Sequence, residues 1–167
     1  MRKKMLPSTK QKSRGARGYI PVSKTDNWAT PQYLYDEYNA KYQLTCDAAA
    51  SARNTKCPKF FTKKQDGLKQ DWGTERVWCN PPYGRVLGKW MQKADDACRA
   101  GATVVMLVPS RTDTKWFHKI AMKRKKVFLK GRVKFGNGKS PAPFPSLVVV
   151  FTPRARRRGA AGTAATR

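Results

Sequence analysis

The chain has 167 residues, of which 36 are Lys or Arg and 10 are Asp or Glu, so its formal net charge is +26. This length allows one folded domain with tails and excludes a multidomain assembly. The longest apolar runs are far shorter than the roughly 20 residues that cross a bilayer, and the basic N-terminus lacks the apolar stretch of a secretory signal. We therefore expect a cytoplasmic protein without a membrane span.

The chain begins and ends with basic segments. We expect a flexible basic arm over residues 1–25, a folded domain over 26–152 and a flexible basic tail over 153–167. The folded part alone keeps a formal charge of about +13. Because phosphates neutralise such an excess, nucleic acid is the leading partner. The alternative is that the tails only aid solubility or contact anionic surfaces without specificity.

The first half of the domain is predicted to hold one helix and two short strands. Thr30-Pro31 is typical of a helix start, with a capping hydroxyl and a proline in the first turn, so we expect a helix over 31–40. Residues 42–46 favour a strand that ends at Asp47. Residues 76–79 favour another, which ends at Asn80 because the two prolines that follow cannot donate to a sheet.

The second half alternates helices and strands. Apolar residues at three- and four-residue spacing predict a helix over 85–99, ended by Gly101. The continuous apolar run 102–108 is typical of a parallel strand buried on both faces. A further helix is expected from 112 or 113, and then strands over 127–135 and 147–151 as an antiparallel hairpin at one edge. This order predicts an α/β three-layer sandwich with a mostly parallel sheet.

The cysteines and the single histidine do not form a metal-binding pattern. Cys46, Cys57, Cys79 and Cys98 have no Cys-x-x-Cys spacing, so we interpret them as small core residues. With His118 as the only histidine, no Cys/His zinc site has a plausible spacing. We expect no metal.

Polar residues follow several predicted strands. Ligands of open α/β sheets bind beyond the carboxyl ends of the strands, where Asp47, Asn80 and residues 109–113 are expected to meet. The most informative segment is Asn80-Pro81-Pro82-Tyr83, because its prolines fix the backbone while an amide and an aromatic ring stand side by side. Chance would produce this tetrapeptide on the order of once in a thousand chains of this length or less.

Asn-Pro-Pro-Tyr after an apolar strand resembles motif IV of the S-adenosylmethionine-dependent amino-methyltransferases. Within that group, the chain resembles the phage-type DNA N6-adenine methyltransferases (Dam-like family) in Trp28-Ala29-Thr30-Pro31, Cys46 to Ser51, Asp66-Gly67-Leu68 with Asp71-Trp72, and Arg111 to Thr114 with Trp116-Phe117. The likeness covers about residues 26–152. It implies a class I methyltransferase (Rossmann-like) fold, trimmed in its first half, and action on double-stranded DNA in a bacterial host cell, often with a phage or prophage origin.

The resemblance also implies roles for single residues. The Asn80 side-chain oxygen and the Pro81 carbonyl are expected to accept hydrogen bonds from the adenine amine, with Pro82 fixing the turn and Tyr83 stacking on a flipped-out base. The cofactor S-adenosylmethionine is expected to bind through Trp28, Thr30, Pro31, Asp47, Ala48, Ala49, Ser51, Asp66 and Leu68, with Asp66 preferred over Asp71 at its adenine ring. Contacts to DNA are expected from Arg85, Arg111, Asp113, Lys123, Arg124, Lys125 and Phe144.

Several alternatives stay open from sequence alone. Asp47 could cap a helix, and Phe144 could either close over the target base or plug the end of the hairpin. Arg111 and Asp113 could form a loop ion pair instead of binding DNA. The same motif also serves cytosine N4 amines, RNA adenines and protein glutamine amides. The rival from another class is a non-enzymatic basic protein that coats DNA. We expect a monomer.

Overall fold

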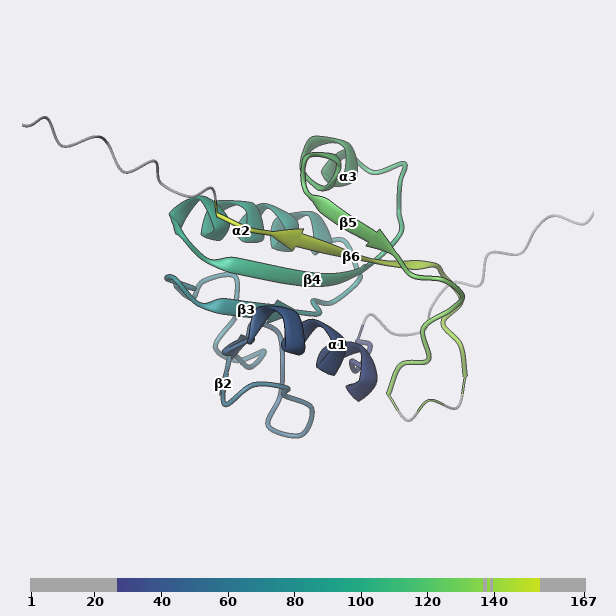
Figure 1. The fold of residues 1–167 in the computed structure, drawn as a ribbon, viewed down its shortest axis with the longest axis horizontal. Helices are drawn as coiled ribbons and strands as arrows, with labels where there is room; N and C mark the ends of the chain where they lie inside the picture. Colours follow the sequence, from purple (N-terminus) through teal and green to yellow (C-terminus); the bar gives the residue numbers. More distant parts are fainter. Residues whose placement is uncertain (1–26, 137, 139, 154–167) are drawn as a thin grey trace, which may run out of the picture.

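Six strands form one mixed sheet with helices on both faces (Figure 1). The computed structural model describes residues 27–136, 138 and 140–153. The predicted arm 1–25 and all but the first residue of the predicted tail 153–167 lie outside this part. No helix within the described ranges is long and apolar enough to cross a membrane.

The elements alternate along the chain much as predicted. They are α1 (Gln32–Tyr42), β1 (Cys46–Asp47), β2 (Lys59–Phe60), β3 (Arg76–Cys79), α2 (Leu87–Ala100), β4 (Thr103–Pro109), α3 (Lys115–Lys119), the 3-10 turn η1 (Ala121–Lys123), β5 (Lys125–Phe128) and β6 (Ser146–Phe151). The strand order is β2-β1-β3-β4-β6-β5. Strands β1 to β4 pair in parallel, whereas β6 is antiparallel to both β4 and β5. The last two strands therefore form an antiparallel pair at one edge, as expected, with β6 placed between β4 and the outer strand β5.

Some predicted boundaries differ from the structure. Helix α1 continues to Tyr42, and Gln43 then turns the chain in the left-handed region with φ 50°, so the strand expected over 42–46 shrinks to β1. Strand β2 was not predicted, because two partly exposed residues carry no periodic signal. Strand β5 ends at Phe128, well short of the expected 135.

Each face of the sheet carries its own apolar core. Along β4, Val104 and Met106 pack on the face covered by α2, while Val105 and Leu107 pack on the face covered by α1. This alternation confirms that β4 is buried on both sides and that the molecule has three layers. All four cysteines are buried free thiols, as predicted for core residues.

Charged groups join the amino ends of the strands. Asp95 of α2 is buried and pairs with Arg99 and Arg124, at 2.5 Å in each case. On the other half of the sheet, Lys59 and Glu75 form an ion pair at 2.8 Å. The first set ties α2 to the residue before β5, and the second ties β2 to the residue before β3. They lie where the parallel strands begin, which we call the amino edge.

Candidate functional site

The polar residues singled out by the sequence lie at the opposite edge, beyond the carboxyl ends of the parallel strands. We call this the carboxyl edge; β1, β3 and β4 end here, and β6 and α1 begin here (Figure 1). Two backbone hydrogen bonds join the loops: Ala48 N–H donates to Trp78 O at 2.9 Å, and Ser110 N–H to Pro145 O at 2.8 Å. The parallel pairing of β1 with β3 and of β3 with β4 places their carboxyl ends side by side, as predicted.

The side-chain amide of Asn80 has a fixed orientation. Its Nδ2 donates to Trp28 O at 2.5 Å and to Thr30 Oγ1 at 2.9 Å, so both amide hydrogens have partners. Because a backbone carbonyl can only accept, the nitrogen must face Trp28 and the oxygen must face the other way. The scaffold thus presents Asn80 as a hydrogen-bond acceptor.

Thr30 supports this arrangement. The prediction that its hydroxyl caps α1 is wrong. The helix begins at Gln32, its flanking residue is Pro31, and no side chain caps its first turn. The Thr30 hydroxyl oxygen instead accepts hydrogen bonds from Asn80 and, at 3.2 Å, from Trp78 Nε1. A buried donor without an acceptor costs more free energy than an exposed N–H in the first turn of a helix, which water can satisfy.

Tyr83 lies against Asn80 and is only 1% exposed. Its hydroxyl donates to Asn80 Oδ1 at 2.7 Å and to Leu107 O at 3.2 Å. Burial raises the pKa of the phenol well above its ordinary value, so the hydroxyl remains a neutral donor. Its ring meets Phe135 and Phe144 edge-on, with centroids 6.0 and 5.6 Å away. In this conformation the ring has no open face for a base.

Phe144 lies over the site. Its ring is 5.1 Å from the Trp28 ring and perpendicular to it, in addition to its contact with Tyr83. These contacts are compatible with both alternatives for Phe144, so its role stays a prediction.

Buried polar atoms without partners gather at this edge. In the described ranges they are Trp28 Nε1, Ser110 Oγ and Ser146 Oγ. Trp28 contacts Asn80, while Ser110 and Ser146 flank the junction of β4 and β6. Each such atom costs about 1–3 kcal/mol, so native proteins keep few of them. All three belong to residues at the edge that carries Asn80.

Asp47 ends β1 and is 4% exposed. Its carboxylate accepts hydrogen bonds from Ala49 N–H at 3.3 Å and Lys56 N–H at 3.1 Å, so it shapes the loop that follows. Burial is the main cause that raises its pKa from 3.8 to about 6, and these two N–H groups partly oppose the rise. Ser51, at the end of that loop, is exposed and bonds to Asn54.

Asp66, Gly67 and Leu68 pack beside the same loop. A Cβ at Gly67 would lie 2.1 Å from Ala48 O, a contact that only glycine permits. Trp72 Nε1 donates to Gly67 O at 3.0 Å and fixes the segment. Asp66 therefore lies next to the loop after β1, whereas the Asp71 carboxylate is exposed and bonds to Gly73 N–H at 2.8 Å.

The predicted DNA contacts fall into two groups. Arg85, Arg111 and Asp113 are exposed on loops of the carboxyl edge, and no ion pair joins Arg111 to Asp113. Lys123, Arg124 and Lys125 lie at the amino edge, because Lys125 pairs with Val150 near the start of β4.

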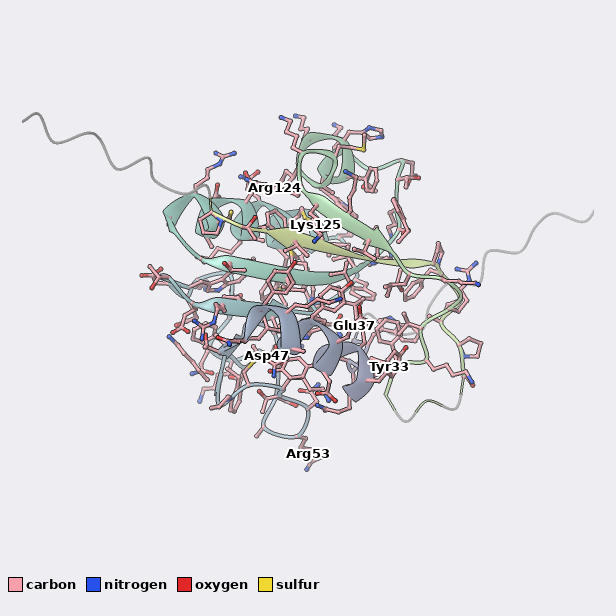
Figure 2. All side chains as sticks on the ribbon, in the orientation of Figure 1. Tyr33, Glu37, Asp47, Arg53, Arg124 and Lys125 are labelled. Carbon is pink, nitrogen blue, oxygen red and sulfur yellow. The ribbon has the colours of Figure 1, made fainter. Side chains whose placement is uncertain are left out.

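Figure 2 shows Arg124 and Lys125 at the start of β5, away from Tyr33 at the carboxyl edge. Arg124 is also committed to Asp95, with a side chain only 22% exposed. The structure therefore does not bring these three basic residues together with Asn80. Their contact with DNA stays a prediction.

Sequence reasoning missed three positions that shape the site. Trp78 is fully buried in β3 and holds Thr30; Gly67 allows two loops to touch; Phe135 closes over Tyr83. The adjacent Asp66-Gly67 pair was the one readable signal, since such a pair often marks a tight turn. Groups of three or more His, Cys, Asp or Glu side chains placed to hold a metal ion do not occur in the part of the chain that the structure describes.

The sheet order and the position of the site define the class of protein. Four parallel strands are followed by the antiparallel β6, which is inserted before the edge strand β5. With Asn80-Pro81-Pro82-Tyr83 at the carboxyl end of β3, this is a class I methyltransferase (Rossmann-like) fold in trimmed form. The fold expected from the sequence is confirmed.

The chain belongs to the DNA N-6-adenine-methyltransferase (Dam) family, whose model matches residues 17–159. It is 31% identical over 144 residues to the DNA N-6-adenine-methyltransferase of Haemophilus phage HP1 (strain HP1c1), covering 80% of this chain and 82% of that protein. It is 38% identical over 102 residues to the protein of the same name from Escherichia phage T1, covering 58% of this chain and 41% of that protein. The expected family and the methyltransferase enzyme class are confirmed.

Among solved structures, the chain is similar to a crystal structure from Pyrococcus horikoshii that is described as a candidate RNA methyltransferase. The TM-score is 0.40 and the identity 16%, over 60% of this chain and 52% of that chain.

Proposed function

We propose that this protein transfers a methyl group from S-adenosylmethionine to the exocyclic N6 amine of an adenine in double-stranded DNA, at Asn80. The observation that carries the proposal is the orientation of the Asn80 amide, whose two hydrogens are held by Trp28 and Thr30. An amide fixed in this way offers only its oxygen to a substrate, and an exocyclic amine offers N–H groups.

The chemistry requires acceptors at this point. The lone pair of the adenine amine is delocalised into the ring, so the nitrogen becomes nucleophilic when its N–H bonds are drawn toward fixed acceptors. Asn80 Oδ1 is one acceptor, with a second lone pair beside the Tyr83 hydrogen bond. The Pro81 carbonyl accepts no hydrogen bond from any described residue and is the second. Acceptors that are already oriented avoid reorganisation during the reaction.

The residues that would hold the cofactor lie on both sides of the ends of β1 and β3. Trp28 has a buried indole N–H without a partner, and the small side chains of Ala48 and Ala49 leave room beside the backbone. The N–H groups at the start of α1, after Thr30-Pro31, suit the carboxylate of the methionine moiety, and Asp66 with Leu68 suits its adenine end. When bound, S-adenosylmethionine supplies an electrophilic methyl group on a sulfonium.

The target base must leave the duplex to reach Asn80, at a cost of a few kcal/mol. Tyr83 can stack on that base only after Phe144 withdraws, because Phe144 now lies against its ring. Arg85 and Arg111, exposed at the same edge, would contact phosphates and offset part of the cost. Asp113 on the neighbouring loop is exposed as well and can face the base edges.

The biological setting follows from the relatives. Both matched proteins are phage methyltransferases, so we place this chain in the cytoplasm of a bacterial host, encoded by a phage or prophage. We expect it to act as a monomer, because the site is built from one chain.

Methyl transfer by the purified full chain tests the proposal. With labelled S-adenosylmethionine, duplex DNA should gain label, and Asn80→Ala should lower the rate at least about 100-fold while salt-dependent DNA binding is unchanged. Gln92→Ala, which removes an amide from the exposed face of α2, serves as the matched control and should retain full activity. Most of the activity surviving in Asn80→Ala would contradict the role of this amide. Tight binding without any labelling would favour the non-enzymatic alternative.

A further inference from the structure

The segment after β5 runs along the carboxyl edge and is fixed at three points. Leu129 N–H donates to Ser146 O at 3.0 Å, Ala142 N–H to Val133 O at 2.9 Å, and Gly136 N–H to Ala29 O at 2.8 Å. The last bond places its end one residue from Trp28, which holds Asn80. This segment is therefore a wall of the catalytic site, although sequence reasoning assigned it only to a strand.

The segment has an apolar inner face and a basic outer face. Val133 and Phe135 point inward, 4% and 7% exposed, and Phe135 lies against Tyr83. Lys130, Arg132 and Lys134 occupy the alternate positions and are exposed. Three cations thus stand directly outside the residues that cover the site. We call these three residues the basic strip.

The strip has no anionic partner. Its three side chains form no ion pair with any described residue. The acidic side chain among those that line the groove is Glu37, which already pairs with Lys41 at 3.0 Å. Three like charges on one short segment repel one another, and only an anionic ligand would relieve that repulsion.

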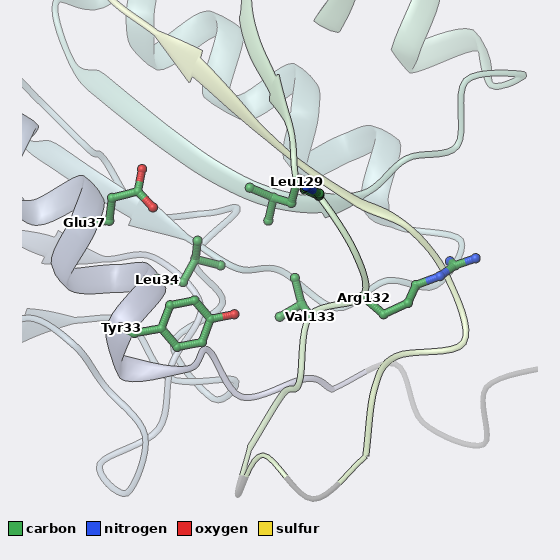
Figure 3. Close-up of a pocket in the computed structure, with 7 residues that line it drawn as sticks. Tyr33, Leu34, Glu37, Leu129, Arg132 and Val133 are labelled. Atoms are coloured by element: carbon green, nitrogen blue, oxygen red, sulfur yellow. The ribbon is translucent and has the colours of Figure 1, made fainter.

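A shallow groove runs beside the strip. The first turns of α1 form one wall, and the segment after β5 forms the other, with Tyr33 and Arg132 on opposite sides (Figure 3). Its volume of about 140 Å³ is below the roughly 300–1,000 Å³ of pockets that enclose small molecules. Tyr33 is 62% exposed. Arg132 points away from Tyr33, to the outer side of the segment (Figure 3). The arrangement suits a nucleic-acid strand whose sugar or base lies against the tyrosine ring and whose phosphates follow that outer side.

We propose that the basic strip binds the phosphates of the DNA strand that carries the target adenine. The inference rests on the proposed function, since it assigns a grip on the same substrate next to the same site. Its position explains the need: a nucleotide turned out toward Asn80 leaves its flanking phosphates outside Phe135, where Lys130, Arg132 and Lys134 stand. The strip acts on affinity and positioning, and Asn80 acts on the amine.

The test compares two triple substitutions that remove equal charge. One is Lys130→Gln, Arg132→Gln and Lys134→Gln; the other is Lys89→Gln, Lys115→Gln and Lys119→Gln, on exposed residues of α2 and α3. Both are made in the full chain carrying Asn80→Ala, and binding to a fluorescent duplex is measured from 50 to 300 mM salt. The Asn80→Ala background separates binding from catalysis. The proposal for the basic strip can therefore be confirmed or contradicted whether or not methyl transfer is found.

The strip variant should lose at least about tenfold in affinity near 100 mM salt. Its slope of log K against log salt should fall by about 2 to 3, close to 0.9 for each lost phosphate contact. The second triple variant should lose less than about threefold. Equal losses, or a larger loss from the second variant, would overturn the proposal. Arg132→Gln alone, which leaves the fold undisturbed at an exposed position, should lower the slope by about 1; an unchanged slope would also overturn it.

Discussion

The two edges of the sheet differ in whether their polar and charged groups have partners within the chain. At the amino edge, Asp95 is surrounded by two arginines and Glu75 pairs with Lys59. At the carboxyl edge, buried polar atoms lack partners and the cations of the strip stand alone. The amino edge is satisfied within the chain and stabilises it. The carboxyl edge keeps polar and charged groups without partners among the described residues, and it is also the edge that carries Asn80.

The contrast predicts that substitutions at the amino edge change stability alone, whereas substitutions at the carboxyl edge also reach the candidate site. The largest effect is expected at Asp47, on the carboxyl edge. Burial raises the pKa of this carboxyl from 3.8 to about 6, so the folded state holds the proton more tightly than the unfolded chain does. The contribution of Asp47 to the free energy of unfolding therefore falls as pH rises from about 4 to about 6, and it is level above pH 6. The total fall is about 3 kcal/mol, at about 1.4 kcal/mol per pKa unit.

Asp47→Asn removes this titration. Measured by urea unfolding, the stability of the variant relative to the unsubstituted protein should rise between pH 4 and 6 and be constant from pH 7 to 8. Asp36→Asn, at an exposed carboxylate, is the control and should show no such trend. A relative stability of Asp47→Asn that does not change with pH would contradict the cost of burying this group.

The next effect is expected at Gly67. Its Cβ would meet Ala48 O at 2.1 Å and a Trp90 ring atom at 2.9 Å, so Gly67→Ala should lower the free energy of unfolding by about 2–3 kcal/mol. It should also raise KM for S-adenosylmethionine several-fold, since Asp66 and the loop after β1 must separate. Gly88→Ala, whose Cβ would find only ordinary contact at 3.7 Å, should be neutral or stabilising. Similar behaviour of the two variants would count against the close approach.

At the amino edge, Asp95→Ala should cost stability and leave catalysis alone. This substitution leaves Arg124, which is 22% exposed, without its partner. Arg99 is 70% exposed, so the loss of its ion pair costs little free energy. Thermal or urea unfolding should show a loss of about 2 kcal/mol, with kcat unchanged below the unfolding temperature. Asp96→Ala, at the exposed neighbour, should cost under about 0.5 kcal/mol. A large fall in kcat for Asp95→Ala would break the separation of the two edges.

The smallest effect is expected at Thr30, which we interpret as a positioning residue. Thr30→Val removes the acceptor that orients Asn80 and Trp78, so kcat should fall about tenfold with little change in KM for S-adenosylmethionine. Thr30→Ser keeps the hydroxyl and should restore most of kcat. A rise in KM with unchanged kcat would instead make Thr30 a direct cofactor contact.

Local patterns predicted most of the fold, because α2 has helical periodicity, β4 is a continuous apolar run, and Asn80-Pro81-Pro82 ends a strand abruptly. What they could not predict depends on long-range partners. The Thr30 hydroxyl serves donors 48 and 50 residues away, which no local rule reveals. Lys123 to Lys125 follow the predicted site residues in the sequence. However, β5 runs in the same direction as β4 and so starts at the amino edge, which places these residues away from Asn80.

The central claim is that the Asn80 amide, oriented by Trp28 and Thr30 at the carboxyl edge, acts on the N6 amine of adenine in DNA. Mass spectrometry of nucleosides, from the DNA of a methylation-free bacterial host that expresses the full chain or Asn80→Ala, tests it most directly. We expect N6-methyladenine with the unsubstituted chain, none with Asn80→Ala, and no N4-methylcytosine with either. Equal N6-methyladenine in both, or N4-methylcytosine in its place, would contradict it.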